Sequence, residues 1–398
     1  MCARAPSCTC TTNDRRERRT SCVRVPLLPP IDLMQSTAVP TTPVTAIDLG
    51  LPVSALAACP NNENLVLAAG ADHLTLLATD DDGTLQRLST QLIHKGALDA
   101  IAWGTDAEEL RVAAVGARVV TMHRVVASEG ACERLALALP SGGTRSCCFL
   151  QPTADRLVVT GDDCRCHIVQ VAHAGASAGA GPAPAAVERT LALGSPGVVV
   201  RTHSREPSQL MIAEEDGKIH FIDLRAPAGA RPSLSRDLPA GEADAGGLRD
   251  ADWSAFDPYL VGGVCGKRWV VWDLRQPGLA PPPHTGDAQP SGALCFRWHP
   301  SSASFATAAA TGEHTRAHVQ LHELQPADNA PATGAASGWA AVVGAAAAAP
   351  RLFAHDLPTR VAALAWLPAT APLLLGACDT KVCLWSVGGN VPPVAAIM

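Results

Sequence analysis

Long hydrophobic runs and aromatic residues are both scarce in this chain of 398 residues. No apolar run approaches the length of a membrane-spanning helix, and the alanine-rich stretch at 340–349 is too short to cross a bilayer. There is no secretory signal, so we expect a soluble protein without membrane insertion. Aromatic residues make up only 4% of the chain, so the places where they recur are informative.

Helical patterns and phosphate-binding loops are also missing. The glycine pairs Gly142-Gly143 and Gly262-Gly263 lie in predicted strands or turns and precede no predicted helix. A phosphate-binding loop needs a strand, a glycine-rich turn and a helix N-terminus in that order. We therefore expect no nucleotide site, no cofactor and no small-molecule substrate.

The cysteines do not have the spacing of a metal site. Fourteen are present, and those on predicted strands, among them Cys147, Cys265, Cys295 and Cys383, stand singly. The pair at 164–166 has one intervening residue, which is too few for the usual zinc knuckle. We expect free thiols that pack as small hydrophobic groups in a reducing compartment.

The formal net charge of −6 is unevenly distributed, because the first 33 residues hold six arginines against three acidic residues. The rest of the chain is therefore more acidic than the total suggests. An acidic body argues against a general binder of the phosphate backbone. We expect protein partners and no direct contact with nucleic acid.

The body of the chain repeats a pattern that is clearest at Leu248 to Arg275. Three short apolar runs, at 251–254, 259–264 and 269–274, are predicted as strands, and turn residues that include Pro and Gly separate them. The third run contains Trp272-Asp273, the dipeptide that is typical of a propeller blade. One blade cannot bury both faces of its small sheet, so further copies must stack against it.

Copies of this pattern recur at intervals of about 40 to 50 residues, which is the period of propeller repeats. They predict an all-β fold, a seven-bladed WD-repeat β-propeller. The last copy ends at Val387 after three strands. Because an open seam would expose a strand edge, we expect Val44 to Leu49 to close the ring as the outer strand of the seventh blade. The residues that mark equivalent blade positions are Trp103, Phe149, Asp223, Trp253, Trp272, Asp273, Trp298, Trp366, Asp379 and Trp385.

The predicted propeller occupies residues 44–388, between an N-terminal extension at 1–43 and a C-terminal tail at 389–398. Three insertions rich in Ala, Gly and Pro are predicted within it, at 172–186, 227–247 and 326–350. They lack apolar periodicity, so we expect surface loops that folding does not require. The arginine-rich extension is interpreted as a disordered tail or a translated leader before Met34, with a nuclear import signal or a transit peptide as alternatives.

A group of polar residues in the last blade has a catalytic and a structural interpretation. His355 and Asp379 could be a base and its orienting carboxylate, but no Ser or Cys stands beside them in a strained nucleophile turn. A hydrogen-bond network that ties loops to the indole of Trp385 explains them better. Asp162 and Asp216 occupy the same turn position in blades three and four, whereas a catalytic site would occur once. We therefore expect that the protein is not an enzyme.

Two predicted strands end in Asp-Leu-Arg, at 223–225 and 273–275. These segments resemble the box by which some WD-repeat substrate receptors dock on the adaptor of a cullin ubiquitin ligase. The structural alternative is that Arg225 and Arg275 pack at the edge of a blade. We favour packing and keep a ligase substrate receptor as the alternative function.

Several blade motifs resemble the WD-repeat nucleoporin thirty-seven family more closely than WD repeats in general. The similarity runs in order from His94 to Trp385, and it is strongest from Leu210 to Leu324. The motifs are HKGALDAIAW at 94–103, LMIAEEDGKIHFIDLR at 210–225, GGVCGKRWVVWDLR at 262–275 and ALCFRWHPSSASFATAAATGEHTRAHVQLHEL at 293–324. The first blade, the alanine-rich loops and the first 43 residues depart from the pattern of the family.

In that family the propeller is a subunit of the Y-shaped scaffold complex of the nuclear pore, and it docks on the largest arm subunit. The resemblance implies a scaffold subunit in the outer ring of the nuclear pore complex, at the nuclear envelope of the nucleus. Its implied partners are the large scaffold nucleoporin of the Y complex and the other subunits. It would support pore assembly and the transport of protein and mRNA by protein–protein docking, through residues that the resemblance does not assign.

Overall fold

A computed structural model of the chain describes residues 43–80, 83–92, 97–105, 110–116, 119–126, 131–135, 143–151, 154–171, 186–227, 232–238, 247–275, 284–309, 318–324, 351–354, 360–368 and 373–387. All of these residues belong to one unit, Ala38–Met398. The predicted extension, the predicted tail and the insertions predicted at 172–186 and 326–350 lie almost wholly outside the described residues. The insertion predicted at 227–247 is partly described, and it contains the strand β17 (Leu234–Arg236), which forms the outer edge of the fourth blade. Their disorder and their boundaries stay predictions.

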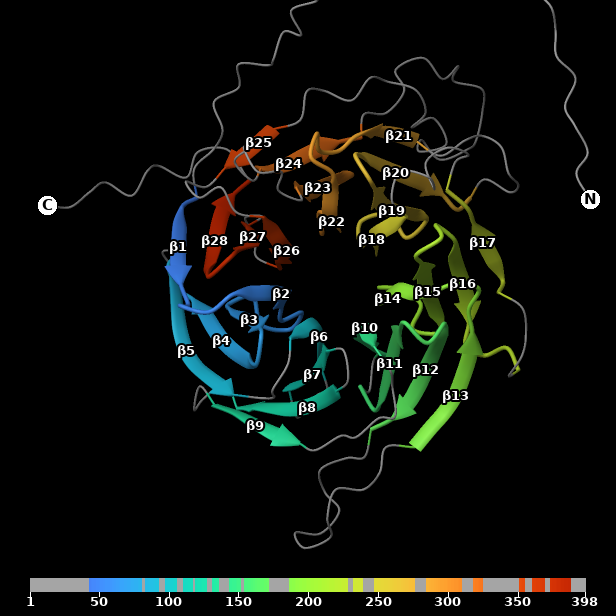
Figure 1. The fold of residues 1–398 in the computed structure, drawn as a ribbon, viewed down its shortest axis with the longest axis horizontal. Helices are drawn as coiled ribbons and strands as arrows, with labels where there is room; N and C mark the ends of the chain where they lie inside the picture. Colours follow the sequence, from blue (N-terminus) through green and yellow to red (C-terminus); the bar gives the residue numbers. More distant parts are fainter. Residues whose placement is uncertain are drawn as a thin grey trace, which may run out of the picture. The chain divides into compact units, whose positions relative to one another are not determined.

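Every regular element among the described residues is a β-strand, and the strands form seven four-stranded antiparallel sheets. In Figure 1 the sheets stand like blades around a central channel, which confirms the predicted all-β, seven-bladed propeller. Local sequence explains the strands, because short aliphatic runs are punctuated by turn residues such as Gly217 and Gly266, which adopt positive φ angles of 97° and 54°. The described residues include no helix that is long and apolar enough to cross a membrane.

The blades are numbered by their innermost strands, which are β2 (Val53–Ala58), β6 (Leu98–Thr105), β10 (Thr144–Phe149), β14 (Gly197–Thr202), β18 (Leu248–Trp253), β22 (Ala293–Trp298) and β26 (Val361–Leu367). The second strands are β3 (Leu65–Gly70), β7 (Leu110–Gly116), β11 (Arg156–Gly161), β15 (Gln209–Glu214), β19 (Leu260–Cys265), β23 (Ser304–Ala309) and β27 (Leu373–Cys378).

The third strands are β4 (His73–Thr79), β8 (Val119–Val126), β12 (Arg165–Gln170), β16 (Ile219–Asp223), β20 (Arg268–Asp273), β24 (His318–Glu323) and β28 (Lys381–Ser386). The outer strands of the first six blades are β5 (Leu85–Leu92), β9 (Ala131–Leu135), β13 (Ala186–Ala192), β17 (Leu234–Arg236), β21 (His284–Asp287) and β25 (Arg351–Ala354). The outer strand of the seventh blade is β1 (Thr45–Asp48).

The ring closes by pairing β1 with β28, as predicted from the missing fourth strand of the last blade. Backbone hydrogen bonds extend the pairing at both ends, from Val44 N to Leu384 O at 2.7 Å and from Leu49 N to Thr380 O at 2.9 Å. Leu49 is buried in the cluster between the seventh and first blades. The edge of β28 is therefore covered by a strand from the other end of the described chain.

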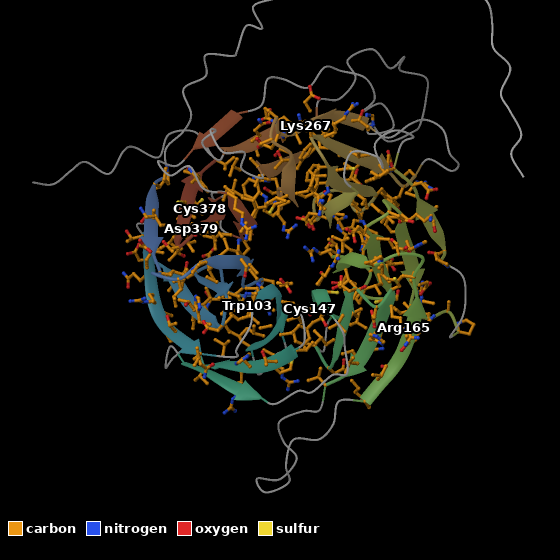
Figure 2. All side chains as sticks on the ribbon, in the orientation of Figure 1. Trp103, Cys147, Arg165, Lys267, Cys378 and Asp379 are labelled. Carbon is orange, nitrogen blue, oxygen red and sulfur yellow. The ribbon has the colours of Figure 1, made fainter. Side chains whose placement is uncertain are left out.

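The hydrophobic core is divided among the seams between blades. The buried residues described here form seven clusters, and each cluster draws its members from two neighbouring blades. In one of them Trp103 of the second blade packs with Leu67 of the first. Figure 2 shows side chains filling these seams, with Trp103 and Cys147 beside the central channel. Each blade therefore depends on both of its neighbours for burial.

The first strand of the central stretch begins earlier than its apolar run predicts. The run at 251–254 indicated a strand from Ala251, whereas β18 begins at Leu248. The difference arises at Asp250, a charged residue that is only 6% exposed. Its carboxylate is buried because arginines of two neighbouring blades pair with it. The two following strands lie within one residue of the predicted runs.

Candidate functional site

Each of the seven innermost strands carries a β-bulge at its second residue. The extra residue has no opposite partner on the second strand, and a bulge re-aims the side chain that it carries. All seven bulge residues line one cavity of about 170 Å³ in the central channel. We call the end of the propeller where they lie the bulge face. The bulge residues are Ser54, Asp99, Arg145, Val198, Arg249, Leu294 and Ala362.

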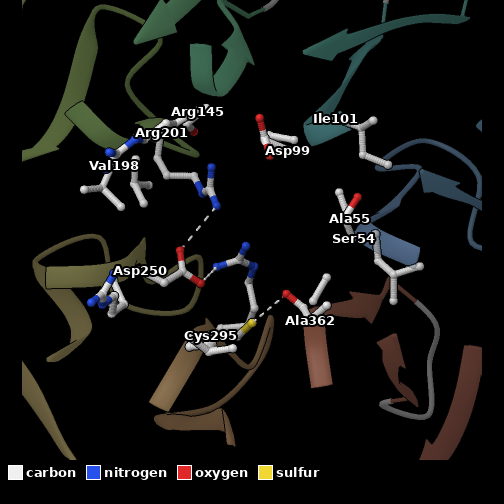
Figure 3. Close-up of a pocket in the computed structure, with 18 residues that line it drawn as sticks. Ser54, Ala55, Asp99, Ile101, Arg145, Val198, Arg201, Asp250, Cys295 and Ala362 are labelled. Atoms are coloured by element: carbon white, nitrogen blue, oxygen red, sulfur yellow. Dashed lines mark hydrogen bonds and ion pairs between the residues drawn. The ribbon is translucent and has the colours of Figure 1, made fainter. Parts of the chain in front are cut away.

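One half of the cavity wall is charged. Arg201 on β14, Asp250 on β18 and Arg297 on β22 come from three consecutive blades. Arg297 Nη1 lies 2.5 Å from Asp250 Oδ2, and Arg201 Nη2 lies 3.8 Å from Asp250 Oδ1. Figure 3 shows the Asp250 carboxylate with an ion pair on either side, and Arg201 reaching into the channel. The Asp250 carboxylate therefore holds two guanidinium groups beside the open space.

Backbone hydrogen bonds fix these carboxylates to the next blade. Asp250 Oδ2 accepts from Phe296 N at 2.9 Å, and Asp252 Oδ2 accepts from Trp298 N at 3.0 Å. Burial raises the pKa of Asp252 against the opposing charges of the arginines. Burial alone would lower the pKa of Arg297, but Asp250 and Asp252 hold it above its ordinary value. Arg297 therefore stays charged in the channel wall.

The other half of the wall is built mainly from small and aliphatic side chains, with Ser54 and Asp99 as its polar members. Ala55 and Ile101 come from the first two blades, and Leu294, Ala362 and Ala363 come from the last two. Small side chains leave space in front of them, so this half of the cavity remains open. The site offers guanidinium donors on one side and aliphatic surface on the other.

The rim of the cavity carries three further charged bulge residues. Arg145 Nε lies 2.5 Å from Asp162 Oδ1, and Arg145 Nη1 lies 3.0 Å from Glu215 Oε2, so this arginine bridges the third and fourth blades. Burial and the nearby Asp162 carboxylate raise the pKa of Asp99, although Arg145 opposes the shift. Arg249 is exposed, and it forms no ion pair within the part of the chain that is described.

Sequence reasoning missed these channel residues, although a signal was present. Arg201, Asp252 and Arg297 occupy the same register position in three consecutive innermost strands. An alignment of the repeats on their first strands would have placed three charges in one column. The individual strands hid this pattern, because one charged residue in a short apolar run, as in β14 and β22, does not stand out, and β18 carries two further charged residues.

Several aromatic residues predicted as blade markers lie in one ring of equivalent positions. Phe149 and Trp253 lie four residues beyond the bulge residue of their strands. The same is true of three tryptophans whose indole Nε1 donates to a carbonyl of the preceding innermost strand: Trp103 to Ala57 O (2.9 Å), Trp298 to Asp252 O (3.1 Å) and Trp366 to Arg297 O (3.3 Å). Trp253 differs, because its Nε1 donates within its own blade to Pro258 O at 2.7 Å. Trp103, Trp298 and Trp366 therefore link neighbouring blades by hydrogen bonds in addition to packing in the core.

The third-strand markers continue the same rows across the sheets. Trp272 faces Val261 on β19, and Trp385 faces Leu374 on β27. Trp385 is fully buried in the seam between the sixth and seventh blades, whereas Asp379 is exposed in the turn before β28 with a φ of 57°. His355 lies outside the described residues, so the predicted network among these three residues stays a prediction. So does the role of the markers as a blade signature.

The two Asp-Leu-Arg boxes lie on the face opposite the bulge face, after β16 and β20. In each box the arginine binds its own aspartate, with Arg225 Nη2 2.7 Å from Asp223 Oδ2 and Arg275 Nη2 2.8 Å from Asp273 Oδ2. The Arg225 side chain is 69% exposed, whereas that of Arg275 is 30% exposed and lies over the Tyr259 ring at 5.3 Å. The boxes are alike in sequence and differ in burial.

The structure corrects one predicted equivalence between blades. The loops after β11 and β15 have the same length, and their register matches Asp162 with Glu215 and Asp163 with Asp216. Asp163 Oδ1 accepts from Arg165 N, and Asp216 Oδ1 accepts from Lys218 N, both at 3.1 Å. The prediction that Asp162 and Asp216 are equivalent was wrong by one residue. The paired residues of the flanking strands decide which loop positions correspond, and the turn sequence alone does not show this pairing. A repeated turn aspartate still exists, as a structural role requires.

A Ser-His-Glu arrangement in the fourth blade resembles a hydrolase triad in its connectivity. His220 Nδ1 lies 2.9 Å from Ser235 Oγ, and His220 Nε2 lies 2.6 Å from the buried Glu214 Oε1. Burial opposes ionisation of Glu214, but hydrogen bonds from His220 and backbone N–H groups lower its pKa.

The third blade repeats this connectivity. His167 contacts Thr190 at 3.1 Å and Asp163 at 2.9 Å. Repetition in neighbouring blades indicates a tie between the third and outer strands rather than a catalytic centre.

The cysteines behave as the sequence predicted. Those whose side chains are described form no disulfide, and all except Cys164 are buried. Cys295 lines the channel cavity, and burial raises the pKa of its thiol to about 12. Such a thiol stays protonated and unreactive. Among the described side chains, no group of three or more His, Cys, Asp and Glu residues is arranged to hold a metal ion.

Comparison with known proteins gives relatives that share sequence and relatives that share fold. No protein-family model matches the chain. The nucleoporin Nup37 of Mus musculus is 32% identical over 133 residues, which are 33% of this chain and 37% of the relative. The human Nup37 matches to the same extent, and the Drosophila melanogaster Nup37 is 27% identical over 88 residues, 22% of this chain and 25% of the relative.

A chain in the crystal structure of a mitotic checkpoint complex has the same fold, with a TM-score of 0.62 and 17% sequence identity over 87% of this chain and 96% of that chain. That likeness concerns the fold alone. The match spans only about a third of the length of the mouse and human relatives, 37% in each. Over that stretch the chain is similar to nucleoporin Nup37, and the family resemblance of its blade motifs is confirmed.

Proposed function

We propose that this protein is a non-catalytic propeller subunit of the nuclear pore complex. The observation that carries the proposal is the 32% identity over 133 residues to the nucleoporin Nup37 of mouse and human. In this role the chain docks on the large scaffold nucleoporin of the Y complex and on other subunits. It thereby supports pore assembly and the transport of protein and mRNA at the nuclear envelope.

The polar contacts described above hold the blades together or repeat from blade to blade, and such structural contacts support a docking role. Inter-blade bonds such as Trp103 to Ala57 and Arg145 to Glu215 hold the seams together, and the histidine clusters repeat from blade to blade. A rigid ring of this kind presents loops on two faces, which is a suitable scaffold for protein partners.

Localisation combined with co-purification tests the proposal. We expect tagged protein at the nuclear rim, with scaffold nucleoporins recovered in near-equal amounts from a gentle extract. As a matched control, the same tag on an unrelated seven-bladed propeller should give neither result. A diffuse signal without nucleoporins would refute the pore assignment.

A substrate receptor of a cullin ubiquitin ligase is the alternative function, and it depends on Arg225 and Arg275. Both guanidinium groups already bind the aspartate of their own box, which favours a role inside the blade. The double variant Arg225→Glu with Arg275→Glu should keep its place at the nuclear rim if it remains folded. A cullin adaptor that co-purifies with the wild type and is lost from this variant would establish the ligase function instead.

A further inference from the structure

We propose that the channel cavity at the bulge face is a binding site for an acidic, aliphatic peptide segment of a partner protein. A carboxylate of the segment binds the guanidinium groups of Arg201 and Arg297, the charge of Arg249 attracts it from the rim, and a neighbouring short aliphatic side chain lies against the aliphatic residues of the wall. This inference stands independently of the proposed function, because it concerns only the geometry and charge of the cavity.

The first argument is the balance of charge on the cavity wall. Four arginines and two aspartates, Asp99 and Asp250, line it. Three carboxylates outside the lining, those of Asp162, Glu215 and Asp252, pair with Arg145 and Arg201, so among the described residues the positive charge left without an ion pair is that of Arg249. Arg249 projects from its bulge without an ion pair among the described residues, so its charge is available to a ligand.

The second argument is the geometry of Arg201. Its guanidinium lies 3.8 Å from Asp250 and 3.7 Å from Asp252, which are both long for ion pairs. Its one described hydrogen bond goes from Nη1 to Val200 O at 3.0 Å. A charge-assisted hydrogen bond to a carboxylate is normally about 2.7 to 2.9 Å long, so a ligand carboxylate would bind this group more closely than its own aspartates do.

The third argument separates a carboxylate from a polyphosphate or a nucleic acid. Asp162 and Glu215 stand at the rim on either side of Arg145, and the surrounding chain is acidic. These charges repel a polyanion but leave room for a single carboxylate beside the arginines. The cavity of about 170 Å³ is of side-chain size.

Fluorescence anisotropy with defined peptides tests the proposal on the purified full chain. The probe is a fluorescein-labelled peptide in which one Glu-Val pair stands in an otherwise uncharged Gly-Ser sequence. We expect saturable binding of this probe, and at least tenfold weaker binding of a Gln-Val peptide and of a Glu-Ser peptide. The first comparison removes the carboxylate and the second removes the aliphatic side chain.

Two channel variants and one control locate the site. Arg249→Gln and Arg201→Gln should each weaken binding of the Glu-Val probe by about tenfold or more, because the first removes the unpaired charge at the rim and the second removes a charge-assisted hydrogen bond. Arg225→Gln, on the opposite face, should bind like the wild type. Arg249 is exposed, so its variant keeps the test decisive even if Arg201→Gln folds poorly.

Three outcomes would overturn the proposal. The first is absence of saturable binding of the Glu-Val probe. The second is binding that Arg249→Gln leaves unchanged. In the third, inorganic pyrophosphate displaces the probe at or below the concentration at which unlabelled peptide does, which would identify a free-anion site. None of these results depends on whether the protein resides at the nuclear pore.

Discussion

Trp298 holds Asp252 by two hydrogen bonds across the seam between the fifth and sixth blades. The backbone N of Trp298 donates to Asp252 Oδ2 at 3.0 Å, and the indole Nε1 donates to Asp252 O at 3.1 Å. Trp103 and Trp366 make the same indole bond across two other seams. Among the described residues, neighbouring blades share no backbone ladder, so side-chain bonds of this kind fix the position of one sheet against the next.

The variant Trp298→Phe is expected to destabilise the ring while keeping an aromatic side chain in place. It loses the indole bond and leaves unfilled volume at a site that is 4% exposed, at a cost of about 1 to 3 kcal/mol. Urea denaturation followed by fluorescence measures the change. Tyr259→Phe, at a half-exposed aromatic, is the control and should have little effect. Equal midpoints for the two variants would show that the seam bond contributes nothing.

Removal of β1 is expected to open the propeller. A truncation that removes residues 1–50 deletes the strand that pairs with β28, whereas removal of residues 1–40 leaves that strand intact. The longer deletion exposes the edge of β28 and the cluster around Leu49, so its melting temperature should fall sharply. The shorter deletion should melt like the full chain. Similar melting temperatures for both truncations would contradict the closure.

Glycine at position 262 makes room for a neighbouring blade. A Cβ added there would overlap the ring of Phe296, which is fully buried on β22. We expect Gly262→Ala to lower the free energy of unfolding by about 1 to 3 kcal/mol through overpacking. In a Phe296→Leu background the smaller side chain leaves space, so the cost of Gly262→Ala should shrink. Strictly additive effects in this double-mutant cycle would argue against the contact.

Stability is expected to fall in mild acid because of His322. Burial lowers the pKa of this histidine to about 4, while its ring stacks on Phe305 and contacts Thr307 Oγ1 at 3.0 Å. In the unfolded chain the histidine titrates near 6.5. Between these values the unfolded state binds a proton that the folded state does not, so stability declines as the pH falls from about 6.5 towards 4.

Between pH 7 and pH 5 this histidine should remove about 2 kcal/mol of stability. His322→Phe keeps an aromatic ring but cannot titrate, so its melting temperature should fall less over the same interval. The comparison isolates His322 from other buried histidines, such as His203 and His299, whose pKa values burial also lowers. An equal fall in the variant would assign the pH dependence to those other groups.

The local sequence determined the strands, the number of blades and the closure of the ring. These features depend on short-range information: apolar runs of strand length, turn residues between them and a missing fourth strand after Val387. Their pattern survives in a single chain because a strand and its turn are contiguous in sequence. The resemblance of motifs such as LMIAEEDGKIHFIDLR to the nucleoporin family could be recognised for the same reason, since each motif is contiguous in sequence.

Only the tertiary structure brought the channel residues together. Arg201, Asp250 and Arg297 lie on three different blades, and each is separated from the next by more than forty residues. Which of their side chains meet depends on how neighbouring blades are staggered and on the seven bulges that re-aim residues towards the channel. Asp250 is the clearest case: a charged side chain is rarely buried unless it is paired, and two arginines from other blades let the folded ring bury this one.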